Sequence, residues 1–509
     1  MSSTANRVVK NTGFLYAKMG ITMFISLYTT RLILNSLGAA DFGIFNIVGG
    51  AIAMLGFLNA AMAGATQRFM SYSEGEGNKK KQKSIFNISI LLHFFIALAA
   101  GIALLIAGYF FFNGILNIPA DRIFAAKVVY GCLIVSTMFT VMSVPYDAVL
   151  NAHENMKYYA IVGIIESLLK LSVALIVVYT FSDKLIVYGV LMACIPLITL
   201  TIMRIYCHKH YTECTIAPKK YCDKTMMKEM TSFAGWNFSG TIASLIGNYG
   251  NGILINHFFG VALNAAMGIG NQLNGQLSIF SNNMLKALTP IIVKKEGARD
   301  RQGMLQYSFI GCKLSFALLA FFAIPCVIET PFILKIWLKN VPEWTILFFR
   351  LQLLRTLLEQ LTISLGTTLS AEGHIKEMNI ISFFTNLLPL IILWFLFSIG
   401  FPPYWLYIVA ILSMVVLPSI AKLYYCKKYC NLKIKTYWNI VLFPSVICAL
   451  IAFMAGYIPS ILLTDWSALV CSTACSFSTF TLCFYFIVLS KDEQEKLVTM
   501  IKKITPRKY

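Results

Sequence analysis

The feature of this sequence that most constrains its fold is a series of long apolar runs. Leu, Ile, Phe, Val and Ala follow one another for roughly 20 residues at a time, the length that an α-helix needs to cross about 30 Å of hydrocarbon. Helices of soluble proteins instead carry an apolar stripe backed by a polar face. Only 13% of the 509 residues are charged, far below the share in soluble domains. The sequence therefore predicts an all-α integral membrane protein.

The apolar runs, separated by polar or turn-rich breaks, predict about 14 transmembrane helices. Their expected positions are 11–36, 42–66, 84–112, 122–148, 157–181, 184–206, 231–258, 262–292, 304–333, 343–369, 377–399, 402–425, 437–460 and 466–489. The first run has no secretory cleavage site after it, so we expect it to be retained as a helix. The longest connection, from Cys207 to Met230, is too short for a soluble catalytic domain.

Positive charge is distributed unevenly over the predicted loops. Of the 42 Lys and Arg residues, 31 fall on loops on the side of the N-terminus. The opposite side has four, namely Arg122, Lys184, Lys335 and Lys339. Cytoplasmic loops are enriched in Lys and Arg. We therefore expect a bacterial inner-membrane protein with both termini in the cytoplasm. The net charge of +20 then comes from short basic loops, so no nucleic-acid partner is predicted.

The chain also repeats itself at an offset of roughly 220 residues. The matching pairs are 115–127 with 338–350, 149–171 with 368–390, and 73–87 with 295–309. Such internal repeats are typical of secondary transporters, whose substrate site lies between the repeats near the middle of the bilayer. Each unit holds an even number of spans, so the two six-helix repeats are expected to run parallel, followed by two extra helices.

This arrangement predicts four regions along the chain. They are a six-helix bundle at 1–206, a cytoplasmic linker at 207–230, a second six-helix bundle at 231–425, and two further helices with a basic cytoplasmic tail at 426–509.

Several charged residues fall inside predicted spans, where each is costly unless it faces a partner or a cavity. The cations are Lys18, Arg31, Lys127, Lys170, Lys313, Arg350 and Arg355, and the central acids are Glu166 and Glu359. The interior is thus predicted to be net cationic, which suits an anionic ligand. We take the seven cations as candidate substrate contacts and the two acids as candidates for binding a coupling ion.

Each of these charges also has a plainer interpretation. Lys127 and Arg350 occupy equivalent positions in the two repeats, and a long basic side chain near a helix end can reach the interface without any other role. Lys170 follows Glu166 by four residues, and Glu359 follows Arg355 by four. Either pair can form an internal ion pair on one helix face or act as a substrate clamp or coupling site.

The run at 262–292 is unusually rich in amides. Asn271 and Gln272 are the central examples, and four more Asn or Gln residues share the span. Amides can hydrogen-bond between packed helices, but so many in one span also suit a wet surface that accepts sugars. We therefore include Asn271 and Gln272 among the candidate substrate contacts.

Motifs for other chemistry are missing from the sequence. Cys207, His208, His210, Cys214 and Cys222 share one loop, but their spacing matches no usual zinc pattern. No P-loop, HExxH or GxSxG string occurs. The sequence predicts a protein that is not an enzyme, with no metal and no cofactor.

Three segments carry a family resemblance. They are SLGAADFGIFNIVGG (36–50), ATQRFMSYSEGEGN (65–78) and VPYDAVLNAHENMKYYAI (144–161). In order and spacing they resemble the Wzx-like O-antigen and capsular polysaccharide flippases of the multidrug/oligosaccharidyl-lipid/polysaccharide (MOP) exporter superfamily.

The resemblance covers all the predicted spans. It implies a MATE-like V of two six-helix bundles, alternating access, and an undecaprenyl-diphosphate-linked oligosaccharide as substrate. It also implies contact with membrane lipid and a pathway shared with glycosyltransferases and a polysaccharide polymerase. By analogy, the two extra helices could offer a groove for the polyprenyl tail.

Three other functions remain open. A cation-coupled multidrug or toxin extruder of the same superfamily usually has 12 helices and uses cavity carboxylates, whereas the first span here carries Lys18 and Arg31 and no acid. A polytopic glycosyltransferase, polymerase or ligase needs a substantial periplasmic loop, and every such loop predicted here is short. A lipid II flippase is the third alternative, and the sequence does not separate it from the others.

Overall fold

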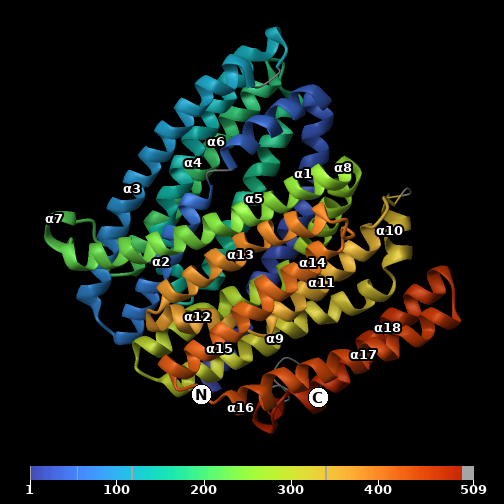
Figure 1. The fold of residues 1–509 in the computed structure, drawn as a ribbon. Coiled ribbons are helices and arrows are strands. Elements are labelled where there is room, and N and C mark those ends of the chain that lie inside the picture. The colour runs from blue at the N-terminus through green and yellow to red at the C-terminus, as the bar shows by residue number, and fades with distance from the viewer. Residues whose placement is uncertain (1, 54–55, 116–117, 339–340, 496–509) are drawn as a thin grey trace, which may run out of the picture. The chain divides into compact units, whose positions relative to one another are not determined.

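A computed structural model of the chain describes residues 2–53, 56–115, 118–338 and 341–495, and within them every regular element is a helix (Figure 1). The predicted all-α fold is thereby confirmed. The chain divides into two compact units. The N-terminal unit comprises residues 11–238, and the C-terminal unit begins at Ser239 and includes the first residues up to Lys10. The predicted basic tail lies from residue 496 onward, outside the described residues.

The N-terminal unit is built from the first helices of the chain. They are α1 (Ser2–Ala53), α2 (Gly56–Glu76), α3 (Lys79–Phe110), α4 (Ile123–Ala152), α5 (Met156–Tyr179), α6 (Lys184–His210), α7 (Pro218–Tyr221) and the start of α8 (Lys224–Gly297). A π-helical turn, Phe111–Ile115, extends α3, and a 3₁₀ turn, Ala120–Arg122, leads into α4.

The C-terminal unit holds most of α8 and all later helices. These are α9 (Arg301–Ile328), α10 (Thr330–Leu338), α11 (Thr345–Gln360), α12 (Ile363–Glu372), α13 (Ile375–Ser398), α14 (Trp405–Ala410), α15 (Leu417–Cys430), α16 (Ile434–Tyr437), α17 (Phe443–Leu462) and α18 (Asp465–Cys483). Short π-helical segments join α14 to α15 at Ile411–Val416 and α16 to α17 at Trp438–Leu442, and another, Phe484–Val488, follows α18.

Two glycines break the longest helices. Gly38 in α1 has φ 76° and ψ 168°, and Gly260 in α8 has φ 83° and ψ −179°. A positive φ of this kind is accessible to glycine and strained for residues with a Cβ atom. Both glycines fall in the gaps predicted between spans, so each long helix consists of two helical segments meeting at a glycine.

The backbone breaks recur at the offset of the sequence repeat. Gly38 and Gly260 are 222 positions apart. Gly77 (φ 69°) and Arg299 (φ 58°) share that separation, and each precedes a helix-capping side chain, Asn78 for α3 and Asp300 for α9. The two units therefore repeat the same turns at corresponding positions, as expected for two parallel repeats.

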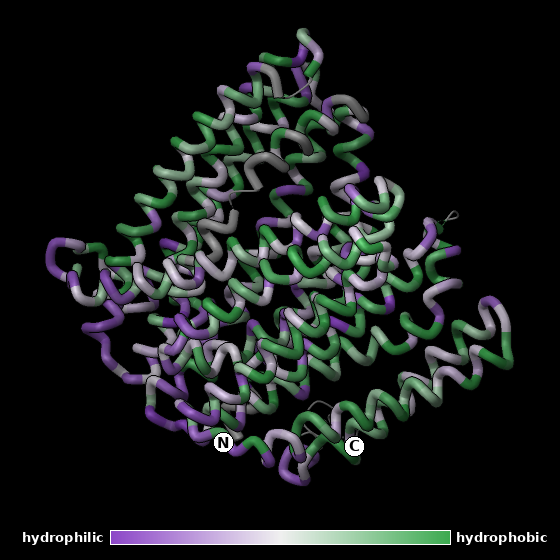
Figure 2. The backbone as a smooth tube through the Cα atoms, viewed as in Figure 1, coloured by the Kyte–Doolittle hydropathy of each residue, from purple (hydrophilic) through white to green (hydrophobic). Residues whose placement is uncertain are grey.

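Nine helical segments of the described residues are long and apolar enough to cross a membrane. Figure 2 shows that their middle stretches are mostly hydrophobic and that hydrophilic residues gather near the connections. Large apolar side chains such as Leu105, Phe395 and Met454 are more than half exposed, which suits contact with lipid. The protein is a multi-pass membrane protein. Each of the 14 predicted spans overlaps a helical segment, but the number 14 itself stays a prediction.

Packing in the N-terminal unit centres on α4, which contacts α2, α3, α5 and α6. One core cluster joins Leu104 of α3 and Val129 of α4 to Leu185 of α6. A second joins Ile33 of α1 and Ala174 of α5 to the α6 helix. These contacts fix α1, α4, α5 and α6 against one another, and the same four helices enclose the cavity described below.

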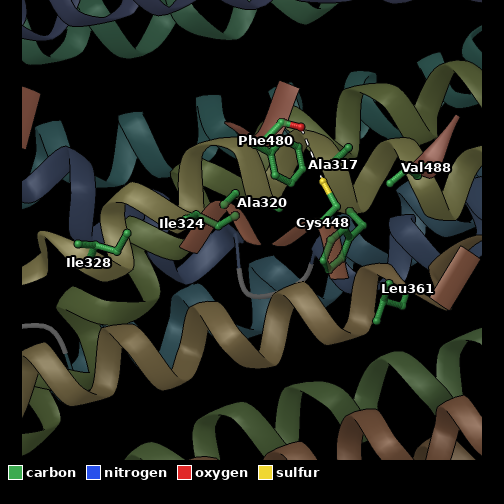
Figure 3. Packing of buried hydrophobic residues seen from close by; sticks show 10 residues of the cluster. Ala317, Ala320, Ile324, Ile328, Leu361, Cys448, Phe480 and Val488 are labelled. Carbon is green, nitrogen blue, oxygen red and sulfur yellow. Dashed lines mark hydrogen bonds between the residues drawn. The ribbon is translucent and has the colours of Figure 1, made fainter. Parts of the chain in front are cut away.

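In the C-terminal unit the last two long helices, α17 and α18, pack against each other and against α9. Figure 3 shows their core, where the Cys448 thiol donates to the Phe480 carbonyl at 3.7 Å beside Ala317 and Ala320 of α9. Gly456 of α17 lies so close to α18 that an added Cβ atom would overlap the Ser476 hydroxyl. Small residues allow this close approach of membrane helices.

Candidate functional site

The N-terminal unit contains a polar cavity of about 180 Å³ between α1, α4, α5 and α6. Its polar lining includes Lys18, Thr140, Ser143, Asp147, Tyr159 and Glu166. The α5 helix lines the cavity with one face. Its residues Tyr159, Gly163 and Glu166 follow the i, i+4, i+7 spacing that places side chains on the same side of a helix. Asn155 begins this helix by accepting a hydrogen bond from the Tyr158 amide at 3.2 Å.

Lys18 is the cation of this cavity. Its Nζ lies 4.2 Å from the centre of the Tyr159 ring, within the range of a cation–π interaction. Its side chain passes directly over Gly163, where an added Cβ atom would overlap both Cε and Nζ of Lys18. The position of the ammonium group therefore depends on a glycine one helical turn from the aromatic ring.

Glu166 and Lys170 form the ion pair that their spacing allows. Lys170 Nζ donates to Glu166 Oε1 at 2.6 Å, and each side chain is 43% exposed. Glu166 also lines the cavity, whereas Lys170 is not among the lining residues. The carboxylate thus has a cationic partner on its own helix while it faces the cavity.

A second polar cavity, of about 40 Å³, lies within the C-terminal unit. Two of the predicted contacts, Asn271 of α8 and Arg355 of α11, line it together with Asn248, Asn251 and Gln352. The break at Gly260 brings the two segments of α8 alongside each other, so that amides on both sides of the break reach one cavity. The two cavities therefore collect Lys18, Glu166, Asn271 and Arg355 of the predicted site.

Lys127 and Arg350, which are equivalent in the repeat, have different surroundings. Lys127 is exposed, and its Nζ lies 5.9 Å from the centre of the Phe112 ring. Arg350 Nε donates to the Val327 carbonyl at 2.8 Å, and Nη2 donates to the Ile328 carbonyl at 3.2 Å. Arg350 thereby satisfies carbonyl groups at the end of α9, where no helical partner is available.

Lys313 in α9 is 2% exposed and paired with an acid near the end of the described chain. Its Nζ lies 2.8 Å from Glu493 Oε1 and 2.6 Å from Oε2. The pair connects α9 to the segment after α18. A role for Lys313 in substrate binding stays a prediction, but its ammonium group already has an internal partner.

The other candidates lie away from both cavities. Arg31 and Gln272 are exposed, and neither lines a cavity within the described residues. Glu359 is partly buried, and no ion pair with Arg355 occurs in the described part of the chain, although the two are four residues apart. A separation of four residues is therefore accompanied by an ion pair in α5 but not in the described part of α11.

Sequence reasoning missed several cavity residues. Asp147 and Tyr159 line the cavity and lie in the motif at 144–161. Asp147 also falls inside the predicted span 122–148, and a carboxylate inside a span could have been recognised as a candidate site residue. Asn248, Asn251 and Tyr407 carried weaker signals, because single amides and tyrosines are common in packed membrane helices.

A separate charged cluster lies outside the membrane-spanning segments. Ligand atoms of Glu74, His153 and Glu213 lie within 4.8 Å of one another. His153 Nδ1 is 3.4 Å from Glu74 Oε1, its Nε2 contacts Glu213, and Lys79 lies 3.8 Å from Glu213. Both ring nitrogens face a carboxylate, and a cation lies beside one of the two acids. We therefore interpret the cluster as an ion-pair network.

This network also affects the acidity of Glu213. Burial alone would raise the pKa of this carboxyl, but the hydrogen bond from His153 and the nearby Lys79 outweigh it. The pKa of Glu213 is therefore lowered below its ordinary value. The network ties the end of α2 to the α4–α5 turn and the α6–α7 connection.

Arg122 joins three connections at another end of the N-terminal unit. Its Nε donates to Asp41 Oδ1 at 2.8 Å, and its Nη1 donates to Asp183 Oδ2 at 2.8 Å. Asp183 also accepts hydrogen bonds from the first amides of α6. One guanidinium thus holds the α1 segment after Gly38 to the starts of α4 and α6.

Membrane-spanning helices arranged as two repeats, each with a polar cavity, define a multi-pass membrane transporter. A family model described as polysaccharide biosynthesis protein matches residues 8–295, more than half of the chain. The chain belongs to this polysaccharide biosynthesis protein family. A search of curated proteins returns no significant match.

Solved structures share the fold. The crystal structure of a MATE point mutant aligns with a TM-score of 0.73 at 12% identity, covering 84% of this chain and 96% of that one. MATE in the bent conformation aligns with a TM-score of 0.73 at 13% identity, covering 85% and 97%.

A MOP superfamily transporter from Pyrococcus furiosus, described as having a binding pocket of reverse polarity, aligns with a TM-score of 0.69 at 12% identity. It covers 84% of this chain and 96% of that one. At these identities the likeness concerns the fold, and the predicted MATE-like, MOP-type architecture is confirmed.

Proposed function

We propose that this protein moves polyprenyl-diphosphate-linked oligosaccharide units across the bacterial inner membrane by alternating access, for the synthesis of a surface polysaccharide. One observation carries the proposal: a member of the polysaccharide biosynthesis family places Lys18 in a polar cavity between helices of a membrane protein. Cations at such positions are expensive and usually serve a ligand or pathway. The diphosphate or acidic sugars of the proposed substrate would supply the matching negative charge.

The physical task explains why a cavity is needed. Sugars and a diphosphate lose their hydrogen bonds to water on entering hydrocarbon, and the cost is several kcal/mol for each unsatisfied group. A polar cavity replaces those bonds while the polyprenyl tail stays in lipid. In this proposal the tail follows α17 and α18, which expose large apolar side chains such as Leu450 and Met454 of α17 and Val470 of α18.

Coupling and topology form part of the same proposal. Glu166 and Glu359 are the candidate carboxylates for a coupling ion. Protonation of Glu166 would weaken its pairing with Lys170 and change the charge facing the cavity.

Both termini are proposed to lie in the cytoplasm, where glycosyltransferases would supply the substrate. A polymerase would receive it on the other side, so the protein itself performs no covalent chemistry.

A second candidate function is the cation-coupled extrusion of drugs or toxins. It is favoured by the likeness to MATE structures and by the carboxylates Asp147 and Glu166 in the same cavity. The net cationic set of residues in the predicted spans argues against cationic drugs as the main substrate.

Deletion of the gene tests the proposal in cells. Polyprenyl-linked oligosaccharide is extracted from the deletion strain, and the membrane face that holds it is determined. We expect complete units stranded on the cytoplasmic face and loss of surface polysaccharide. Normal glycan with increased drug sensitivity would favour extrusion. Truncated units, or unpolymerised units facing outward, would point to an enzyme.

A further inference from the structure

The small cavity of the C-terminal unit is lined by an unusual combination of groups. Asn251 and Asn271 come from the two segments of α8, Arg355 comes from α11, and Tyr407 comes from α14. The α8 segments approach closely at this level, because an added Cβ atom at Gly252 would lie 3.5 Å from Asn264 Oδ1. Four helical stretches, two of them from α8, therefore line one cavity with polar side chains.

Several of these donors and acceptors have no partner in the protein. Tyr407 is 3% exposed and Asn251 is 9% exposed. Among the described residues, the Tyr407 hydroxyl, Asn251 Oδ1 and Arg355 Nε are buried without a hydrogen-bond partner. Buried polar groups left unsatisfied are destabilising, and native structures rarely retain several together without a ligand or water to satisfy them.

The charge of Arg355 is also unbalanced by the protein. Its one hydrogen-bond contact is weak, from Nη1 to Met414 Sδ at 3.7 Å. In the described part of the chain no carboxylate forms an ion pair with it, even though Glu359 lies one helical turn away. A guanidinium beside an unpartnered phenol is a pair of donors that suits an anion.

We propose that this cavity binds one small monovalent anion, either a halide or a single carboxylate. Its volume of about 40 Å³ accommodates a few water-sized groups, given that one water needs roughly 10–15 Å³. Arg355 and Tyr407 donate to the anion, and the amide groups of Asn251 and Asn271 complete its surroundings.

The anion can have two sources. It is a free ion such as chloride or acetate, or it is the carboxylate of an acidic sugar on the transported oligosaccharide. The second source rests on the proposed function, whereas the binding site itself does not. Binding is therefore measured directly, without a transport assay.

The experiment measures saturable binding of ³⁶Cl⁻ to the purified full-length protein in detergent, with sodium glucuronate and neutral glucose as competitors. We expect Arg355→Gln to weaken chloride binding roughly ten- to hundred-fold, as loss of a charged hydrogen bond implies. Arg355→Lys should weaken it less. Tyr407→Phe should weaken it several-fold without altering charge. Lys433→Gln, which removes an exposed cation elsewhere in the same unit, is the matched control and should bind as the wild type does.

Displacement of chloride by glucuronate but not glucose would support a site open to sugar carboxylates. Resistance to glucuronate would support a site for free halide. Absence of saturable binding would overturn the proposal and leave a cavity that holds only water. Unchanged binding in both Arg355→Gln and Tyr407→Phe, each confirmed as folded by size-exclusion chromatography, would also overturn it. Either result would leave the proposed flipping activity untouched.

Discussion

Lys18 of α1 lies with its ammonium nitrogen 4.2 Å from the centre of the Tyr159 ring of α5, and Gly163 provides the space that this position requires. A Cβ atom at position 163 would overlap the end of the Lys18 side chain. A substitution at position 163 can therefore displace the Lys18 ammonium group while the lysine itself stays in the sequence.

The first prediction uses this geometry. Gly163→Ala should move the Lys18 ammonium out of its position and reduce surface polysaccharide by roughly ten-fold, about the effect of losing 1.4 kcal/mol of substrate interaction. Gly131→Ala in α4 is the matched control, because no other atom lies within 4 Å of the added Cβ atom. Both variants are scored for surface polysaccharide at equal protein levels. Equal glycan in the two strains would show that the placement of Lys18 does not matter.

A second prediction concerns the pair formed by the buried Lys313 and the partly buried Glu493. Glu493→Gln leaves the buried Lys313 ammonium without a charged partner. This should destabilise the protein by about 3 kcal/mol, because an ammonium group that stays buried without a counter-charge is costly. Lys170→Gln breaks a half-exposed pair instead and should cost less than about 1 kcal/mol. The midpoint of thermal unfolding in detergent measures both. Equal shifts would mean that the buried pair contributes no more than the exposed one.

The third prediction concerns Arg122. Arg122→Gln removes charged hydrogen bonds to Asp41 and Asp183 and should destabilise the N-terminal unit by roughly 1–3 kcal/mol. Arg122→Lys keeps the charge but loses the two-sided geometry of the guanidinium, so it should fall between wild type and Arg122→Gln. Limited proteolysis at the connections after Gly38 and before α6 reports the loss. Identical digestion of the three proteins would contradict this account of the contact.

A fourth prediction follows from Asp300, which caps α9. A hydrogen bond from Lys295 and another from the Gly303 amide lower the pKa of this carboxyl below its ordinary value. A lowered pKa in the folded state stabilises the protein above the unfolded-state pKa, and the benefit is lost as pH falls through the folded-state pKa.

Asp300→Asn retains a good capping side chain but cannot ionise. Below about pH 4 its unfolding midpoint should therefore decline less steeply than that of the wild type. Asp121→Asn, at an exposed position, serves as the control. Parallel pH profiles for wild type and Asp300→Asn would rule out this contribution.

The fold was predictable because it depends on local signals. Long apolar runs predicted the helices, and the polar or turn-rich gaps between runs predicted the breaks, two of which the structure places at Gly38 and Gly260. The offset near 220 residues reappears as paired positive φ angles at Gly77 and Arg299. These features depend on residues close in sequence, so no knowledge of packing was needed.

The sites were less predictable because they depend on which side chains meet. Position in a span made Lys127 and Arg350 look equivalent, yet Arg350 binds carbonyl groups at the end of α9 and Lys127 is exposed. Spacing alone also treated Glu166–Lys170 and Arg355–Glu359 alike, although only the first pair formed among the described residues. Helix rotation decides such outcomes, and it is set by packing between helices distant in sequence.

The most direct test of the central claim is a flipping assay with the purified protein in liposomes. The substrate is undecaprenyl-diphosphate-linked oligosaccharide with a fluorescent label on the glycan, and an impermeant quencher is added outside, with proton and sodium gradients supplied in separate runs. We predict that quenching proceeds beyond the outer leaflet until nearly all label is lost, either with at least one of the gradients or without any. Quenching that stops at the outer leaflet under every condition, with the protein folded and inserted, would contradict the proposed flipping activity.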